Sequence, residues 1–587
     1  VLMPKIRFHA SAIVVAALLA ACGGEFHDVT SNVPPADLVL MGGEIATVDP
    51  DFGNVQALAV EGYTISAVGT DEEISAFIGP ETEVVELDGR FVMPGFIEGH
   101  GHFLSFGESL RILDLQDVRS WDDVVRMVSV AADGAKPGEW ITGRGWHQDK
   151  WDSVPEDAVE GVPVNDSLSR VSPDNPVRLT HASGHAYFVN DAALEAAGVD
   201  RETPDPRGGT IVRDVDGEAT GMLRETARNI VDAAERRYVQ ALSVAEREAL
   251  DRERVRLAGE RALMFGVTSF QDAGERTRNF FDVIGFMKKL EAEGELPVRL
   301  YMMARGIPVE QLDEALPVLK MLPEGNDFLT VRGIKKQVDG ALGAHGAWLL
   351  EPDADLPDTD GLVLETLEEI EANAEQAVKH GYQLNTHAIG DRAVREILDL
   401  YEGVWGRMDV DGSELRWRIE HAQHILPEDV PRFGELGVIA SIQAVHGTSD
   451  GPWIPTRLGE ERARETSQPW RDLFETGAVV TNGTDVPVER IDPIASFYSS
   501  VSRMMPTGER FYPEHAMTRE EALMTYTINN AYAGFEEGLK GSLAPGKYAD
   551  FIVLSQNLLT IDEERIPETV VEKTFVGGEL KYERSSD

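Results

Sequence analysis

The stretch FVMPGFIEGHGHF, residues 91–103, runs from apolar residues through Pro94 and Gly95 to His100 and His102. Side chains at positions i and i+2 of a strand point the same way, so these two imidazoles can converge on one metal ion. A polar turn that closes a core strand would explain the same letters. The stretch alone therefore leaves both interpretations open, and a metal site requires that the rest of the chain supply the other ligands.

Length and charge limit the class of protein. The chain has 587 residues, of which 42% are hydrophobic. That length exceeds the size at which a single core keeps growing, so we expect one large domain with appended or inserted parts. The net charge is −48, from 102 acidic and 54 basic residues. Such a field repels nucleic acid and anionic lipid, so we expect no nucleic-acid partner, and a small-molecule substrate stays open.

The first residues have the order of a secretory signal. Lys5 and Arg7 precede the uncharged run ASAIVVAALLA, which is too short to span a bilayer. The letters LAAC at residues 19–22 resemble a bacterial lipobox. That resemblance implies a signal peptide over residues 1–21, lipidation of Cys22, and export to the outer membrane facing the periplasm, with the lipid anchor as the only membrane contact. An ordinary cleaved signal with an incidental cysteine is the alternative.

Both ends of the remaining chain carry β patterns. Residues 22–36 are polar and contain prolines, which indicates a tether. Over residues 37–95, short apolar runs alternate with Gly and Asp-Gly turns, which is typical of hairpins. The pattern returns at residues 540–585. We therefore expect a small β-sandwich built from both chain ends around a larger insertion.

The middle of the chain, residues 96–539, alternates strand-like and helical runs. Seven or eight such units favour a parallel sheet closed into a TIM-like (β/α)8 barrel, so the predicted fold class is α/β. A barrel needs about 250 residues, fewer than this region holds. We place an inserted subdomain at about 105–255, a segment rich in Trp, Pro, Gly and Asp.

Metal-ligand residues stand at the ends of the strand-like runs, where a barrel exposes its active site. Beyond the first two histidines they are Lys335, His387, His421 and Asp485. Each has an ordinary explanation: a core histidine, a helix cap for Asp485, or an ion pair of Lys335 with Asp339. Trp417, Ile419 and His421 fall on one strand face, which we expect to point into the barrel.

Six motifs together resemble one family: PGFIEGHGH, GIKKQVDGALG, THAIGDRA, RIEHAQ, NGTDVPV and PGKYADFIVL. They are similar to the amidohydrolase superfamily of metal-dependent hydrolases, and within it to amidohydrolase family 3, the branch of YtcJ-like and N-substituted formamide deformylase-like proteins. The resemblance covers residues 36–585. It implies two divalent metal ions, one held by His100, His102 and Asp485, the other by His387 and His421, with Lys335 bridging them as a carbamate. Imidazole and carboxylate ligands suit zinc, while iron, manganese and nickel stay open.

The resemblance also implies a reaction. A metal-activated hydroxide would attack a carbonyl carbon, and Asp485 would act as base and then as acid. The predicted enzyme is an amidohydrolase that cleaves the C–N bond of an amide, N-acyl or N-formyl compound. Lactone or ester hydrolysis, or deamination of a cyclic amidine, remain alternatives on the same barrel. A lipid-tethered solute-binding protein without catalysis is a third reading, and a homodimer is compatible with all three.

Several further residues are weaker candidates. His185, in RLTHASGHAYFVN, lies near the substrate in similar proteins but also suits a turn. Trp146 could line the pocket mouth or pack in the core of the insertion. His446 ends a strand, as an extra ligand or substrate contact, whereas His424 is expected in a loop. His345 stands where arginine is frequent in this branch, which puts an anion-binding role there in doubt.

Overall fold

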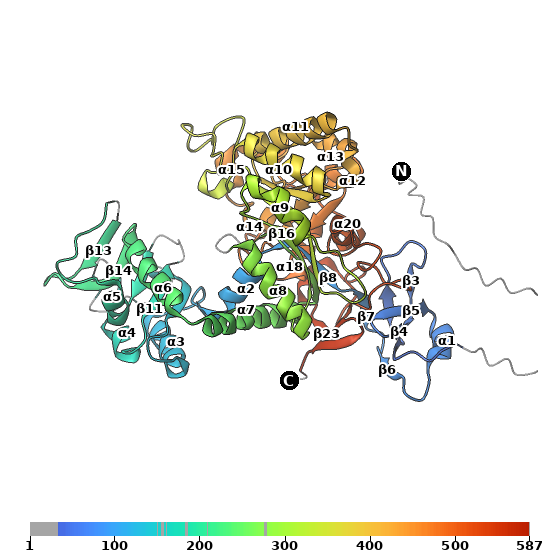
Figure 1. Ribbon diagram of the computed structural model, residues 1–587, viewed down its shortest axis with the longest axis horizontal. Helices are drawn as coiled ribbons and strands as arrows, with labels where there is room; N and C mark the ends of the chain where they lie inside the picture. Colours follow the sequence, from blue (N-terminus) through green and yellow to red (C-terminus); the bar gives the residue numbers. More distant parts are fainter. Residues whose placement is uncertain are drawn as a thin grey trace, which may run out of the picture. The chain divides into compact units, whose positions relative to one another are not determined.

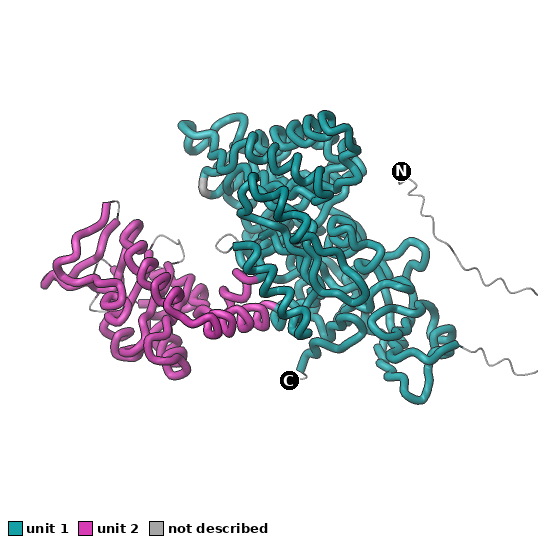
Figure 2. The backbone as a smooth tube through the Cα atoms, viewed as in Figure 1, with its two compact units in different colours: residues 1–103, 259–587 teal, residues 104–258 magenta. Residues whose placement is uncertain are grey.

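The computed structural model describes residues 33–148, 151–153, 158–159, 161–181, 186–207, 209–274 and 279–585. The chain divides into two compact units, shown in different colours in Figure 2. We call residues 1–103 with 259–587 the barrel unit and residues 104–258 the inserted unit. The predicted signal peptide, the lipidation site Cys22 and the candidate His185 lie outside the described residues.

An eight-stranded parallel sheet forms the centre of the barrel unit (Figure 1). In spatial order its strands are β8 (Phe96–Gly101), β15 (Val267–Asp272), β16 (Arg299–Ala304), β17 (Leu329–Gln337), β18 (Gln383–Ala388), β19 (Arg418–His421), β20 (Ile439–Ile442) and β21 (Val480–Asn482). Every neighbouring pair runs parallel. The order follows the sequence, as repeated βα units require, and the predicted α/β barrel is confirmed.

Side chains join the first and last strands, β8 and β21, along an edge that we call the seam. Asn530 Nδ2 donates to Ile97 O at 2.6 Å and to Asn482 O at 2.9 Å, one acceptor on each strand. A Cβ on Gly99 would meet Asn482 O at 2.4 Å, so glycine is needed for this close approach. The two edges are therefore held by a bridging amide.

A buried carboxylate adds a second bridge to the seam. Glu98 on β8 accepts from the Thr484 backbone N–H at 2.6 Å and from its hydroxyl at 3.0 Å. Burial raises the pKa of Glu98 to about 8, although these hydrogen bonds act in the opposite direction. The carboxyl group thus connects β8, the strand that carries His100, to Thr484, the residue before Asp485.

Helices cover the outside of the barrel (Figure 1). Their bounds are α8 (Phe280–Glu293), α9 (Val309–Leu319), α10 (Leu367–His380), α11 (Asp391–Met408), α12 (Gly412–Leu415), α13 (Val430–Leu436), α14 (Ala444–Ser449), α15 (Ile454–Leu458), α16 (Glu460–Thr466), α17 (Trp470–Glu475), α18 (Pro493–Ser502), α19 (Arg519–Thr525) and α20 (Ile528–Ala533). Helix α10 begins at a capping box of Thr366 and Glu369 and ends at Gly381, whose φ is 65°. Among the described helices, none is both long and apolar enough to traverse a bilayer.

The expected orientation of the strand RWRIEH is wrong in one respect. We expected Trp417 and His421 on the face that points into the barrel. The Trp417 ring instead packs on Tyr401 of α11, with ring centroids 4.8 Å apart, so this face is covered by a helix. Arg418 points into the barrel. Its Nη1 donates to Oε1 of Gln271 on β15, a strand on the opposite side of the barrel, at 2.6 Å.

His421 still reaches the barrel interior because its backbone leaves the strand conformation. Its φ is 76° and that of Ala422 is 43°, both in the left-handed region. The alternation of side chains along β19 ends at this point. Glu420 and His421 are adjacent in sequence, and both face the centre of the barrel.

The two chain ends build a β-sandwich, as predicted. One sheet orders β5 (Thr64–Gly69), β4 (Ala57–Glu61), β1 (Leu38–Met41) and β6 (Glu83–Glu86); the other orders β24 (Glu579–Glu583), β23 (Val571–Val576), β22 (Phe551–Leu554), β7 (Phe91–Pro94), β2 (Glu44–Ala46) and β3 (Asn54–Val55). Their inner faces share one apolar core, to which Leu38 and Leu58 contribute from one sheet and Val92, Phe551 and Phe575 from the other.

The inserted unit has its own sheet and core. The sheet orders β13 (Gly209–Arg213), β14 (Ala219–Glu225), β12 (Ala186–Val189), β11 (Val177–His181), β10 (Ile141–Trp146) and β9 (Leu113–Asp114). Its helices are α3 (Trp121–Gly134), α4 (Asp166–Val171), α5 (Asp191–Ala197) and α6 (Arg228–Ala241), and the chain passes between the units within α2 (Phe103–Arg111) and α7 (Val244–Met264). Trp146 is only 1% exposed and donates to Leu179 O at 3.0 Å. It packs among Trp121, Trp151 and Phe188 in the core of this unit, which accounts for its position there.

Candidate metal centre

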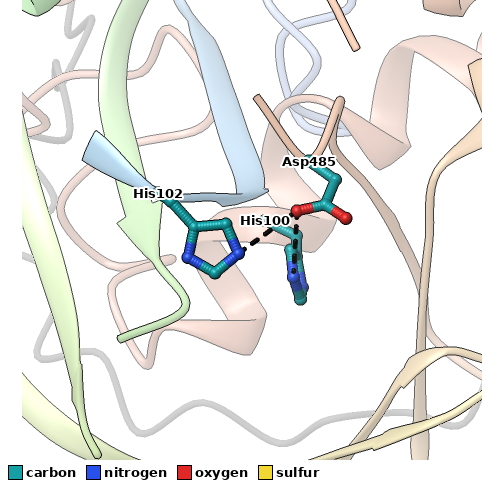
Figure 3. A group of neighbouring side chains, drawn as sticks. All are labelled: His100, His102 and Asp485. Atoms are coloured by element: carbon teal, nitrogen blue, oxygen red, sulfur yellow. Dashed lines mark ion pairs between the residues drawn. The ribbon is translucent and has the colours of Figure 1, made fainter. Parts of the chain in front are cut away.

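Three side chains gather at the carboxyl end of the seam, and we call them the seam cluster: His100, His102 and Asp485. Nε2 of His102 lies 3.3 Å from Asp485 Oδ1, and Nε2 of His100 lies 3.7 Å from the same oxygen. Figure 3 shows both rings near this carboxylate. The ligand atoms of all three residues lie within 4.8 Å of one another. This spacing is what three ligands of one small cation need.

Backbone contacts between the two edges set this arrangement. The Asp485 N–H donates to His100 O at 2.8 Å, and the His102 N–H donates to Val486 O at 2.8 Å. Asp485 has φ 57°, a left-handed conformation that Asp tolerates better than most residues. Its Oδ1 is buried and accepts no hydrogen bond from the described residues. An acceptor held in this way, beside two imidazole nitrogens, is suited to a cation.

The neighbouring strands β17, β18 and β19 carry the inner-wall group: Lys335, His387 and His421. The rings of His387 and His421 lie 4.3 Å apart, and those of His421 and His100 lie 4.7 Å apart. Nε2 of His387 is buried and has no hydrogen-bond partner among the described residues. The structure thus brings these histidines to the same end of the barrel as the seam cluster.

Lys335 is 3% exposed and lies among charged groups. Burial lowers its pKa to about 8, and this exceeds the opposing influence of Glu420 and Asp485. The expected alternative, an ion pair with Asp339, does not describe this site. Asp339 accepts backbone N–H bonds from the loop around it and lies 3.4 Å from His387 Nε2 instead.

Sequence reasoning missed the side chains that hold the imidazoles from outside. Glu420 Oε2 lies 2.6 Å from His100 Nδ1, and Gln443 Oε1 lies 2.6 Å from His421 Nδ1. Such partners fix the ring orientation and leave Nε2 for a metal. Glu420 was overlooked because strand alternation should turn it away from His421. Gln443 follows directly after β20, and its place at a strand end was the available signal.

The charge states in the centre suit a cation. Burial holds the pKa values of His100, His387 and His421 below the usual range, and neighbouring positive groups lower them further. Burial alone would raise the pKa of Asp485, but the contact with His102 and the nearby His100 hold it well below its usual value. Neutral imidazoles beside an ionised carboxylate are the forms that bind metals, so the residues fit the ions that the motifs imply.

Two other predicted histidines lie close to this end of the barrel. His446 offers a nitrogen within 4.8 Å of ligand atoms of His421 and Asp485, and its own Nε2 is buried without a hydrogen-bond partner among the described residues. His446 thus lies beside the centre, and its role as a further ligand or a substrate contact stays a prediction. His424 is 1% exposed, with Nδ1 3.1 Å from Ser467 Oγ.

The sequence of this chain is similar to that of several known proteins. A family model described as the amidohydrolase family matches residues 83–582. Protein LONG AFTER FAR-RED 3 of Arabidopsis thaliana is 34% identical, over 94% of this chain and 93% of its own length. Putative amidohydrolase YtcJ of Bacillus subtilis is 30% identical over 93% and 99%, and N-substituted formamide deformylase of Arthrobacter pascens is 28% identical over 94% and 99%.

Solved structures share the architecture. The crystal structure of an uncharacterized metal-dependent hydrolase from Pyrococcus furiosus superimposes with a TM-score of 0.70 at 28% identity. The match covers 89% of this chain and all of that one. The similarity therefore extends over most of this chain.

Proposed function

The chain belongs to the amidohydrolase family of metal-dependent hydrolases, and from this premise we propose that it hydrolyses the carbon–nitrogen bond of an amide, N-acyl or N-formyl compound. The observation that carries the proposal is the seam cluster, in which a buried carboxylate oxygen without a hydrogen-bond donor faces two imidazole nitrogens. The relative that is an N-substituted formamide deformylase supports the bond type. The products would be a carboxylic acid and an amine.

Two divalent ions, with zinc the best match, would be held by these side chains. His100, His102 and Asp485 would hold one, and His387 and His421 the other, with Lys335 joining carbon dioxide as a carbamate that bridges them. Carbamate formation needs a neutral amine, which the burial of Lys335 favours. When bound, such an ion lowers the pKa of water from about 15.7 to about 7 and polarises a carbonyl oxygen.

The side chains of the protein would handle the proton and the substrate. Asp485 takes a proton from the attacking water and returns it to the departing nitrogen, since its Oδ1 is held at the centre of the cluster. Glu420 keeps His100 in the tautomer that leaves Nε2 directed at Asp485. His446 stands beside this group, where a substrate carbonyl or leaving group would lie.

Hydrolytic profiling of the zinc-loaded protein tests the reaction. The panel contains N-formyl amines, N-acyl amino acids, lactones and cyclic amidines, each followed by product analysis. We expect turnover of amide substrates, its loss with a chelator and its recovery with zinc. If only lactones or only cyclic amidines are converted, the reaction is lactone hydrolysis or amidine deamination, and the proposed amide hydrolysis is wrong. A zinc-loaded protein that binds a solute from the panel but converts none would favour a binding protein.

We also propose that the chain is exported and anchored through a lipid on Cys22, facing the periplasm. Support comes from the charged, apolar and small-residue order of the segment that ends in LAAC. Cys22→Ser is expected to move the protein from the outer-membrane fraction to a soluble or uncleaved form. Unchanged fractionation of this variant would contradict the anchor.

A further inference from the structure

The connection between β17 and α10, residues 338–366, holds a second cluster of metal-ligand side chains. His345 Nδ1 lies 3.2 Å from Asp353 Oδ2 and 3.8 Å from Asp355 Oδ1. The ligand atoms of these three residues lie within 4.8 Å of one another. We call them the loop cluster. The proposed reaction uses none of them.

Asp353 is the residue that points to a ligand. Its side chain has no exposed surface. Neither of its carboxylate oxygens has a hydrogen-bond partner among the described residues, and the same holds for the buried Nδ1 of His345. A buried polar group left unsatisfied costs about 1–3 kcal/mol, and a charged one costs more. A positive charge between these atoms would remove that cost.

Another aspartate of the same connection shows how a buried carboxylate is normally satisfied. Asp339 is also fully buried, yet it accepts N–H bonds from Trp348 at 2.9 Å, Ile389 at 3.0 Å and Gly390 at 2.8 Å. Three backbone N–H donors therefore stabilise the carboxylate of Asp339. Asp353 lies in the same connection, but its two carboxylate oxygens receive no such N–H bonds from the described residues. A buried carboxylate in this loop is therefore not always satisfied by the backbone, and Asp353 needs another partner.

The nearby guanidinium does not fill the role. Arg457 on α15 pairs through Nη1 with Oδ2 of Asp355 and donates through Nη2 to Gly343 O at 3.2 Å. It therefore neutralises the outer oxygen of Asp355 and leaves Oδ1 near His345. The two oxygens of Asp353 receive nothing from it.

We propose that His345, Asp353 and Asp355 bind a divalent transition metal ion, with zinc the best match, as a structural site separate from the catalytic centre. One imidazole and two carboxylates suit zinc or manganese, whereas calcium and magnesium prefer oxygen ligands alone. The ion would fasten the middle of the connection. The two ends of the connection are already held together, because Leu364 N–H donates to Val338 O at 2.8 Å.

Zinc content per chain tests this site with His345→Arg and His345→Ala. Each protein is dialysed against buffered zinc and measured by elemental analysis. Both variants are expected to hold one zinc ion fewer per chain than the unaltered protein. The arginine variant places a fixed positive charge beside Asp353 and should keep its Tm, whereas the alanine variant should melt earlier. An unaltered zinc content in the arginine variant would overturn the proposal and leave a His345–Asp353 ion pair.

A second pair of variants separates this site from the catalytic one. The double variant His100→Ala, His102→Ala is expected to lose hydrolysis and the zinc ion of the seam cluster, and still to retain the zinc ion of the loop cluster. Adding Asp353→Asn to it should remove that ion. A double variant that retains no zinc would also refute the loop cluster as a site, whether or not the proposed hydrolysis is found in the unaltered protein.

Discussion

The seam cluster and the inner-wall group lie at the same end of the barrel but are held in different ways. The inner-wall residues stand on β17, β18 and β19, whose backbones form a continuous parallel ladder. The seam residues lie at the end of β8 or shortly after β8 and β21, two strands that side chains such as Asn530 join. A continuous backbone ladder holds the inner wall. The seam combines side-chain bridges with backbone bonds such as those from Asp485 N–H to His100 O and from His102 N–H to Val486 O. Asp485, which moves protons in the proposed reaction, therefore belongs to the side of the centre that lacks a continuous backbone ladder.

Glu420 crosses between the two groups. It belongs to β19 of the inner wall, yet its carboxylate contacts His100 of the seam at 2.6 Å. Burial would raise the pKa of Glu420, but the contact with His100 and the nearby Lys335 keep it below its usual range. One charged side chain thus connects a strand of the inner wall to a histidine of the seam cluster.

The largest expected effect comes from Asp485→Asn. It should lower turnover by at least about 100-fold, because a general acid and base is lost at the seam. Steady-state kinetics on the best substrate of the panel gives the change, and zinc content measured alongside separates lost proton transfer from lost metal. Asp492→Asn is the matched control, since asparagine can also cap α18, and its turnover should be unchanged. Equal turnover of Asp485→Asn and the unaltered protein would refute the assigned role.

Glu420→Gln tests the link between the two groups. The variant keeps the shape of the side chain but loses its charge, so zinc affinity should fall by about 10- to 100-fold. Competition with a chelating dye measures the affinity. Glu428→Gln is the control, because that carboxylate is largely exposed on the surface, where it pairs with Arg395, and its loss should leave zinc affinity intact. If both variants bind zinc alike, His100 is oriented by something other than Glu420.

Asn530→Ala tests whether the seam depends on its bridging amide. The change leaves two buried carbonyls without their donor, which should lower the free energy of unfolding by about 2–4 kcal/mol. Asn529→Ala serves as control, because its amide donates a single, half-buried hydrogen bond to Val480 O and should cost about 1 kcal/mol. Denaturant unfolding followed by tryptophan fluorescence measures both. Equal losses would mean that the seam is held by the strands themselves.

The sequence predicted the family, the barrel and the sandwich correctly because motifs at strand ends and hairpin turns are local signals. Contacts that cross the barrel were not predictable in this way. Glu420 meets His100 over 320 positions of sequence, and only the fold places them together. The orientation of β19 was misjudged because the left-handed φ of His421 breaks the period of two on which the expectation rested. Backbone conformation of that kind leaves no mark in hydrophobic patterning.

The smallest expected effect concerns acid stability on the inner-wall side. Burial and the nearby Arg462 lower the pKa of His424 to about 3. The unfolded chain takes up a proton at this imidazole as the pH falls below about 6.5, and the folded chain does not, so stability falls with acidification between these two values. His424→Gln removes the proton uptake. Between pH 7 and 5.5 the variant should lose about 1 kcal/mol less unfolding free energy than the unaltered protein. Denaturant midpoints at both pH values measure this difference, and parallel losses in the two proteins would show that proton uptake at His424 does not contribute to the acid sensitivity of the protein.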